Sequence, residues 1–192
     1  MCLAIFKPKG IPFNDFLIES MHNSYYSNQD GIGFALKRNN SIIVKKGVVT
    51  PEIAVKWIED LDPKADEEML IHLRTSTQGK IMAKNCHPFI INRSVEKCVD
   101  PDTISDFPVL IHNQVFSSGL YDNTHPEYSD TFHVTNQLLA DPSILSLMRS
   151  NTKLFIKLMD GVFGSNKVAI MFPVKETILL GTWLVDKEVH FS

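Results

Sequence analysis

The sequence is poor in cysteine, with three in 192 residues. An odd number of cysteines without regular spacing argues against a disulfide framework and is typical of a reducing compartment. The sequence also lacks an apolar run long enough to span a bilayer, and its N-terminus does not read as a signal peptide. We therefore expect a soluble, cytoplasmic protein that is not inserted in a membrane.

Three further absences narrow the choice of ligands. A net charge of -3 gives no electrostatic reason to expect nucleic-acid or anionic-membrane binding. No glycine-rich loop joins a strand to a helix, so a dinucleotide-binding parallel sheet is not expected. Cys86, Cys98 and the scattered histidines lack the paired spacing of a zinc site, and we predict no metal.

The apolar pattern that is present predicts an α+β protein. Strands are expected at 3–6, 31–36, 42–49, 69–73 and 109–112, and in a closing meander at 167–172, 177–181 and 187–191. Helices are expected over 13–21, where apolar residues recur at helical spacing, after Thr50 (whose hydroxyl should cap the helix), from Ser129 or Asp130 through 140, and from 142 through 159. Antiparallel blocks of strands separated by pairs of helices favour α+β over a doubly wound sheet. With 44% hydrophobic residues, residues 1–192 should fill one core as a single domain.

Cys2 directly follows the initiator methionine. Methionine aminopeptidases remove Met1 when the next side chain is small, and the mature chain would then begin with a thiol and a free α-amine on one residue. An α-amine titrates near pH 8, so its neutral fraction can take the proton of the thiol. A cysteine at the second position is by itself usually incidental, and further residues must support a catalytic role.

Polar residues at strand ends supply candidates for such support. Arg74 ends the strand 69–73, where its planar guanidinium either holds a carboxylate or forms a structural salt bridge. His87 lies in a polar turn, either as a ligand or base or as a satisfied turn histidine. Asn113 follows a buried strand; its amide either faces an oxyanion or belongs to a turn. Asp130 lies at a helix start, where helix capping is the alternative to a functional role.

In this order, the motifs of the chain resemble the glutaminase domain of the class II glutamine amidotransferases, which are N-terminal-nucleophile hydrolases. The motifs are the Met-Cys start, the segment 28–33, Arg-x-x-Thr-x-Gly at 74–79, Asn-x-His-Pro at 85–88, His-Asn at 112–113 and Ser-Asp-Thr at 129–131. They cover nearly the whole chain with family-like spacing. The resemblance implies a four-layer αββα sandwich of two mainly antiparallel sheets, with no metal and no cofactor.

The resemblance also implies catalytic roles. Cys2 would attack the side-chain amide of L-glutamine with its own α-amine as the base, through a γ-glutamyl thioester. The side chain of Asn113 and the backbone N–H of Gln114 would stabilise the oxyanion. The family usually has glycine at the position of Gln114, and glycine tolerates a positive φ where a Cβ does not.

A free amino acid carries two charges, and its site needs a partner for each. The resemblance assigns the α-carboxylate of glutamine to Arg74 and its α-ammonium to Asp130. Thr77 and His87 would line the pocket. Gln78 replaces a bulkier residue common in this loop, a departure that we expect to affect gating more than chemistry.

Family members usually carry a second domain that consumes the ammonia, and we predict no fused synthase domain within 1–192. Three functions remain open. The chain is a glutaminase that supplies ammonia to a separate synthase or ligase subunit, an amidohydrolase acting on another γ-glutamyl amide, or a catalytically retired binding or regulatory module. The presence of both Arg74 and Asp130 favours glutamine, whereas Gln114 favours retirement.

Overall fold

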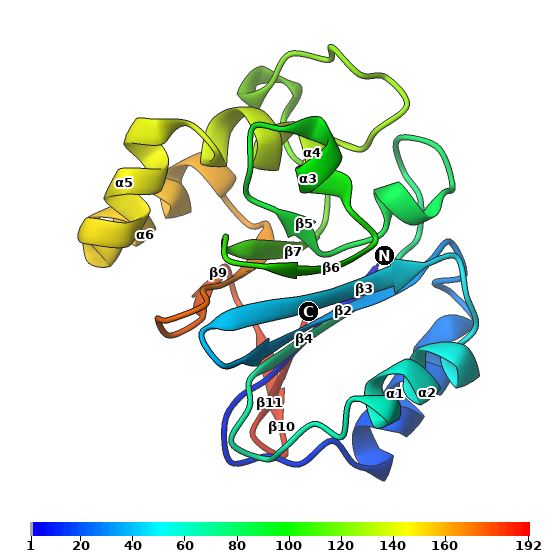
Figure 1. Cartoon of the computed structure of the whole chain (residues 1–192). Helices are drawn as coiled ribbons and strands as arrows, with labels where there is room; N and C mark the ends of the chain where they lie inside the picture. The colour runs from blue at the N-terminus through cyan, green and yellow to red at the C-terminus, as the bar shows by residue number, and fades with distance from the viewer. Residues whose placement is uncertain (1) are drawn as a thin grey trace.

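The strands of the protein form two sheets, both antiparallel throughout, in a computed structural model that describes residues 2–192 (Figure 1). The first sheet has the strand order β10-β11-β1-β4-β2-β3-β6 and the second β5-β7-β8-β9. Helices lie between these strands in the chain. The predicted α+β class with two antiparallel sheets is therefore confirmed.

The seven-stranded sheet contains the N-terminal strand near its middle. Its members are β1 (Leu3–Lys7), β2 (Ile32–Arg38), β3 (Ser41–Gly47), β4 (Met69–Leu73), β6 (Asp102–Ser105), β10 (Leu184–Asp186) and β11 (Val189–Phe191). In the β1–β4 ladder, Leu3 pairs with Leu73 and Ala4 with His72. Cys2 and Arg74 extend this register by one residue, so the two strand ends lie side by side.

The four-stranded sheet consists of β5 (Phe89–Ile90), β7 (Val109–Asn113), β8 (Lys167–Met171) and β9 (Ile178–Leu180). Alternate residues of β7 face opposite sides because side chains in a strand alternate. Ile111 belongs to the apolar cluster between the two sheets, which also contains Ala4 and Leu70. Leu110 belongs to the cluster under the helices on the outer face.

Two pairs of helices cover the outer faces of the sheets (Figure 1). Helices α1 (Asp15–Tyr25) and α2 (Pro51–Asp60) pack on the seven-stranded sheet through Leu17, Met21, Ala54 and Ile58. Helices α5 (Pro142–Ser150) and α6 (Thr152–Phe163) and a π-helix, Val134–Leu139, pack on the other sheet. Shorter elements are α3 (Val95–Val99), α4 (Asp130–His133) and the 3-10 turns Ala83–Asn85 and Ser118–Leu120.

The helix predicted from 142 through 159 is two helices. Asn151 interrupts it with φ -140° and ψ 72°, outside the helical region. Its side chain accepts a hydrogen bond from the N–H of Leu154 and so caps the start of α6. The prediction was wrong because the apolar pattern continues across the break, while the short polar side chain of Asn151 favours a cap.

Of two predicted helix caps, one is absent and one is present. The hydroxyl of Thr50 makes no capping hydrogen bond to α2. Ser129, not Asp130, caps α4 by accepting from the N–H of Phe132 at 3.3 Å. The α-helix then ends at His133 and continues as the π-helix through Leu139, so the predicted helix exists with a wider last segment.

The closing meander is divided between the two sheets. Strands β8 and β9 pair with each other, whereas β10 and β11 form a hairpin that adds to β1. Lys187 and Glu188 form its turn with positive φ values, within the segment that was predicted as one strand. The hairpin β2–β3 likewise turns at two residues, Asn39 and Asn40, both with positive φ. None of the helices within residues 2–192 is long and apolar enough to cross a bilayer.

Candidate functional site

A small cavity lies at the end of the layer between the two sheets and contains the predicted nucleophile. It is lined by Cys2, Arg74, Thr75, Thr77, Gln78, His87, His112, Gln114, Ser129, Asp130 and Thr131. Six of the seven predicted site residues are therefore brought together: Cys2, Arg74, Thr77, His87, Gln114 and Asp130. The seventh, Asn113, is not among the lining residues. The cavity volume is about 20 Å³, room for about one water molecule.

Strand pairing explains why residues so distant in sequence meet here. The β1–β4 register places Cys2 beside Arg74 at one edge of the larger sheet. Nε2 of His72, on β4, lies 3.0 Å from the backbone oxygen of His112, on β7. This contact ties the two sheets together where β7 ends, and the segment after β7 forms the opposite wall of the cavity.

The Cys2 thiol is held by the backbone of Thr75. The N–H of Thr75 donates to Sγ at 3.3 Å, and Sγ lies 3.4 Å from the carbonyl oxygen of the same residue. Burial raises the pKa of the Cys2 thiol, although the Thr75 N–H and the charge of Arg74 oppose this shift. At pH 7 the thiol is therefore protonated and needs a base. The predicted removal of Met1 concerns a residue outside the described range.

Arg74 is 3% exposed and points into the loop that follows it. Its guanidinium donates to Ser76 Oγ at 3.0 Å, to the carbonyl of Gln78 at 2.8 Å and to the carbonyl of Lys80 at 3.2 Å. Within residues 2–192 it forms no ion pair, so the structural salt bridge considered from the sequence is not present. The positive charge of Arg74 thus remains uncompensated by a direct carboxylate partner in this part of the chain.

Asp130 is the buried anion of the cavity, 4% exposed. Its Oδ2 accepts from the N–H of Phe116 at 2.6 Å, and Thr131 Oγ lies 3.5 Å from Oδ1. Because Ser129 caps α4, the carboxylate of Asp130 is not needed as the helix cap. The site therefore combines one buried cation and one buried anion with a thiol.

The loop after Arg74 forms one wall of the cavity. Thr77 and Gln78 are exposed on the outside of this loop and also line the cavity. Oε1 of Gln78 accepts a hydrogen bond from the hydroxyl of Tyr121 at 3.3 Å, which joins this loop to the segment after β7. Because the cavity has room for about one water molecule, binding of a larger molecule requires its walls to move.

Three buried histidines support the cavity from the sheet side. The rings of His72 and His87 lie 3.9 Å apart between centroids, and the backbone N–H of His112 donates to Nδ1 of His87 at 3.5 Å. Burial lowers the pKa of His87 well below its ordinary value, and that of His72 to about 3. Both imidazoles are therefore neutral at pH 7.

His112 is engaged at both ring nitrogens. Nδ2 of Asn166 donates to the carbonyl of Phe163, which directs Oδ1 of Asn166 to Nε2 of His112 at 2.8 Å. Nε2 must therefore donate, and Nδ1 accepts from the hydroxyl of Thr131 at 2.9 Å. Burial lowers the pKa of His112, so the ring is neutral.

Asn113 ends β7 and faces the layer between the sheets. Its Nδ2 donates to the hydroxyl of Ser192 at 3.0 Å, and its Oδ1 is buried without a hydrogen-bond partner among residues 2–192. Asn113 pairs with Lys167 in the sheet and does not belong to a turn. The amide is thus near the start of β1, but its donor is engaged with Ser192.

Gln114 has φ 109°, a backbone conformation that favours glycine. Its side chain is exposed and its Oε1 accepts from Ser165 at 3.2 Å. Its backbone N–H has no hydrogen-bond acceptor within the part of the chain that the structure describes. The backbone at this position therefore has the positive φ expected of the glycine that the family usually has here, although Gln114 carries a side chain.

Several residues of the site were not predicted from the sequence. His112 belongs to the His-Asn motif, and Thr131 to the Ser-Asp-Thr motif, so neighbouring signals could have pointed to both. Asn166 and Ser192 occur in no such motif. Their contacts depend on the pairing of β8 with β7 and of β11 with β1, which a single sequence does not reveal.

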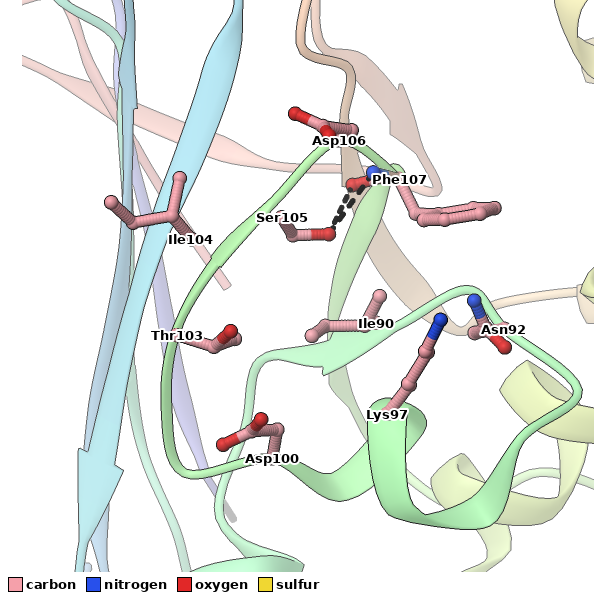
Figure 2. A pocket seen from close by; sticks show the side chains of 9 residues that line it. All are labelled: Ile90, Asn92, Lys97, Asp100, Thr103, Ile104, Ser105, Asp106 and Phe107. Carbon is pink, nitrogen blue, oxygen red and sulfur yellow. Dashed lines mark hydrogen bonds between the residues drawn. The ribbon is translucent and has the colours of Figure 1, made fainter.

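A larger cavity, of about 270 Å³, lies between β6 and α3. Figure 2 shows its lining side chains, with Ile90 near the centre and polar side chains such as Lys97, Asp100 and Thr103 around it. The hydroxyl of Ser105 bonds both backbone groups of Phe107, so it is not free to act as a nucleophile. The Ser105 hydroxyl of this cavity is therefore already engaged, whereas the smaller cavity is lined by the thiol of Cys2.

Among residues 2–192, no group of three or more His, Cys, Asp or Glu side chains is arranged to hold a metal ion. The candidate site thus consists of the thiol, the two buried charges and the neutral hydrogen-bond donors described above. No family model matches this chain, and a search of curated proteins finds no match either.

Proposed function

We propose that the protein hydrolyses the side-chain amide of L-glutamine at Cys2 and releases ammonia. The observation that carries the proposal is the shared cavity of Cys2, Arg74 and Asp130. A thiol that shares one cavity with a buried cation and a buried anion matches an amino acid that carries a reactive amide and two charged groups. Arg74 would bind the α-carboxylate, Asp130 the α-ammonium, and Thr77 and His87 would contact the bound substrate.

The chemistry begins with removal of the thiol proton by the free α-amine of Cys2. The sulfur then forms a bond to the amide carbon, and the carbonyl π electrons move to the oxygen. The N–H of Gln114 and a side-chain donor, Asn113 by the resemblance, stabilise this oxyanion. The α-ammonium returns the proton to the amide nitrogen, the carbonyl re-forms as the C–N bond breaks, and ammonia leaves behind a γ-glutamyl thioester. Water then attacks the thioester, and glutamate and the free thiol are formed.

The proposal also assigns the protein to a fold family and to a partner enzyme that uses the ammonia. Two antiparallel sheets stacked between helix pairs are compatible with the αββα sandwich of the N-terminal-nucleophile hydrolases. The ammonia would be used by a separate synthase or ligase. The strained backbone at Gln114 supports the alternative of a retired binding or regulatory module, because a glycine would adopt this φ without strain. An amidohydrolase of another γ-glutamyl amide would use the same thiol and both buried charges, because such a substrate keeps the α-carboxylate and the α-ammonium; it would differ from glutamine in the leaving amine.

Glutamate release from L-glutamine by protein that lacks Met1 tests the proposal. Wild type should release glutamate, and Cys2→Ala should release none while keeping the same thermal unfolding midpoint. The mass of the natively expressed protein establishes whether Met1 is removed. Equal glutamate release by wild type and Cys2→Ala would exclude a catalytic Cys2.

Substitutions of the two charges test the choice of substrate. Asp130→Asn keeps an acceptor for the N–H of Phe116 but removes the charge, and Arg74→Lys keeps a cation without the planar fork. Loss of a charge-assisted hydrogen bond typically costs about 1.5–3 kcal/mol, a roughly ten- to hundredfold loss of glutamine affinity. If Asp130→Asn binds glutamine as wild type does, the α-ammonium site is assigned wrongly.

A further inference from the structure

The side chain of Asn113 is not positioned to donate a hydrogen bond to the oxyanion of the proposed reaction. The amide of Asn113 donates to Ser192 and does not line the cavity. Donors that are fixed before the reaction stabilise an oxyanion most, because they need no reorganisation when charge develops. A suitable donor would be a buried N–H or O–H of a lining residue that does not already donate to another group.

Most of the buried donors in the cavity are already used. The guanidinium of Arg74 bonds the loop that follows it, and both ring nitrogens of His112 are engaged. The N–H of Thr75 donates to the thiol itself. Thr77 and Gln78 are exposed and belong to the loop that forms one wall of the cavity.

His87 is different because one of its nitrogens is fixed and the other is free. Its Nδ1 accepts from the backbone N–H of His112, so in the neutral ring the proton is on Nε2. Nε2 has no hydrogen-bond partner among residues 2–192, and the ring lines the cavity with Cys2. Contacts with His72 and Phe89, at 3.9 and 5.1 Å between ring centroids, hold the ring in place.

We propose that the Nε2–H of His87 donates a hydrogen bond to the carbonyl oxygen of the substrate amide during attack by Cys2. The inference rests on the proposed function and assigns His87 the oxyanion role that the resemblance gives to Asn113. His87 keeps its proton throughout, since it stabilises the charge that moves onto oxygen without transferring a proton. Burial keeps the pKa of His87 low, so the ring donates as neutral imidazole across the physiological pH range.

A matched pair of substitutions tests this role. His87→Gln places an amide N–H near the position of Nε2, whereas His87→Met has a similar length and no donor. Loss of one oxyanion donor lowers kcat by on the order of a hundred- to a thousandfold. We expect this loss in His87→Met with little change in KM, and a much smaller loss in His87→Gln.

Alkylation of Cys2 by iodoacetamide separates this effect from damage to the nucleophile. The thiolate displaces iodide at a saturated carbon, so no oxyanion forms. Both His87 variants should alkylate at the wild-type rate although their glutaminase rates differ. Wild-type turnover in His87→Met would overturn the inference, and an inactive Asn113→Ala beside it would return the oxyanion role to Asn113. Equal losses of turnover in the two His87 variants would also overturn it.

Nitrogen NMR of the wild-type protein gives a test that does not need a stable variant. The His87 ring should show the neutral Nε2–H form from pH 5 to 8, and its Nε2–H signal should shift when an aldehyde analogue of glutamine forms a hemithioacetal with Cys2. A proton on Nδ1, or no shift on formation of this adduct, would overturn the inference. If wild type releases no glutamate, the proposed function fails first, and with it the role of His87.

Discussion

The amide of Asn113 and the hydroxyl of Ser192 lie 3.0 Å apart, and this contact joins the residue that follows β11 of the seven-stranded sheet to the end of β7 in the four-stranded sheet. The same hydroxyl accepts from the N–H of Ala4 at 2.8 Å. One side chain therefore satisfies two donors that are otherwise buried.

Ser192→Ala should lower the free energy of unfolding by roughly 1–3 kcal/mol, because a buried polar group without a partner costs about this much. Ser192→Thr retains the hydroxyl and should stay within about 0.5 kcal/mol of wild type. Urea unfolding measures both values. Equal stability of wild type and Ser192→Ala would contradict the importance of this contact.

Gln114→Gly should raise the free energy of unfolding by about 1 kcal/mol. A residue with a Cβ at φ 109° costs roughly 1–3 kcal/mol, and the greater freedom of glycine in the unfolded chain offsets part of this gain. Gln114→Ala is the control, since it loses the contact with Ser165 but keeps the Cβ. Higher stability in the alanine variant than in the glycine variant would show that the backbone is not strained.

The fold was predictable where local patterns were strong. Strands such as β4 and β7 are nearly continuous apolar runs, and their predicted bounds differ from the observed ones by at most one residue. The break at Asn151 and the division of the last strands between two sheets were not predicted. Both depend on contacts that an apolar pattern does not contain: a side-chain cap in the first case and pairing with β1 in the second.

The site was predictable to a similar extent. Motif order placed Cys2, Arg74 and Asp130 together, and the cavity contains all three. The orientation of Asn113 was not accessible, because its partner Ser192 is 79 residues away in sequence. The tautomer of His87 likewise depends on a backbone N–H of the neighbouring strand.

The three thiols should differ strongly in reactivity. Burial raises the pKa of Cys86 to about 11 and that of Cys98 to about 12, and both thiols are fully buried. Cys2 is partly exposed, and burial raises its pKa less strongly. Iodoacetamide at pH 8 should therefore label Cys2 first, by peptide mass spectrometry. The labelling rate of Cys2 should continue to increase with pH beyond the ordinary thiol pKa of about 8.5. Equal labelling of the three thiols would contradict the structure.

Lys46 should make the stability of the protein depend on pH. The ammonium is buried, donates to the carbonyl of Pro88 at 2.7 Å and lies 4.5 Å from the centre of the Phe89 ring. Burial lowers the pKa of Lys46 from 10.5 to about 8, so between these values the unfolded chain holds more protons than the folded one. The free energy of unfolding therefore contains a contribution that rises with pH in this window, by about 3 kcal/mol.

Comparison with Lys46→Met isolates this contribution, because the cysteines titrate in both proteins. Denaturant unfolding between pH 7 and 10.5 should show wild type gaining stability relative to the variant. A difference between the two proteins that does not change over this range would mean that Lys46 keeps an ordinary pKa.

The hydrogen bond between Tyr121 and Gln78 should slow the entry of glutamine, because it holds two walls of a cavity that has room for about one water molecule. Tyr121→Phe removes the hydroxyl and keeps the ring, which stacks on His133. A partly exposed hydrogen bond of about 0.5–1 kcal/mol corresponds to a roughly two- to fivefold change in the population of the open loop. Labelling of Cys2 by a glutamine-derived diazo-ketone should accelerate by this factor.

Gln78→Met removes the acceptor of the same hydrogen bond and should accelerate labelling equally. The double variant should label no faster than either single variant, because both substitutions break one bond. Unchanged labelling rates in both single variants would mean that another contact, such as that of Arg74 with the carbonyl of Gln78, keeps the loop closed.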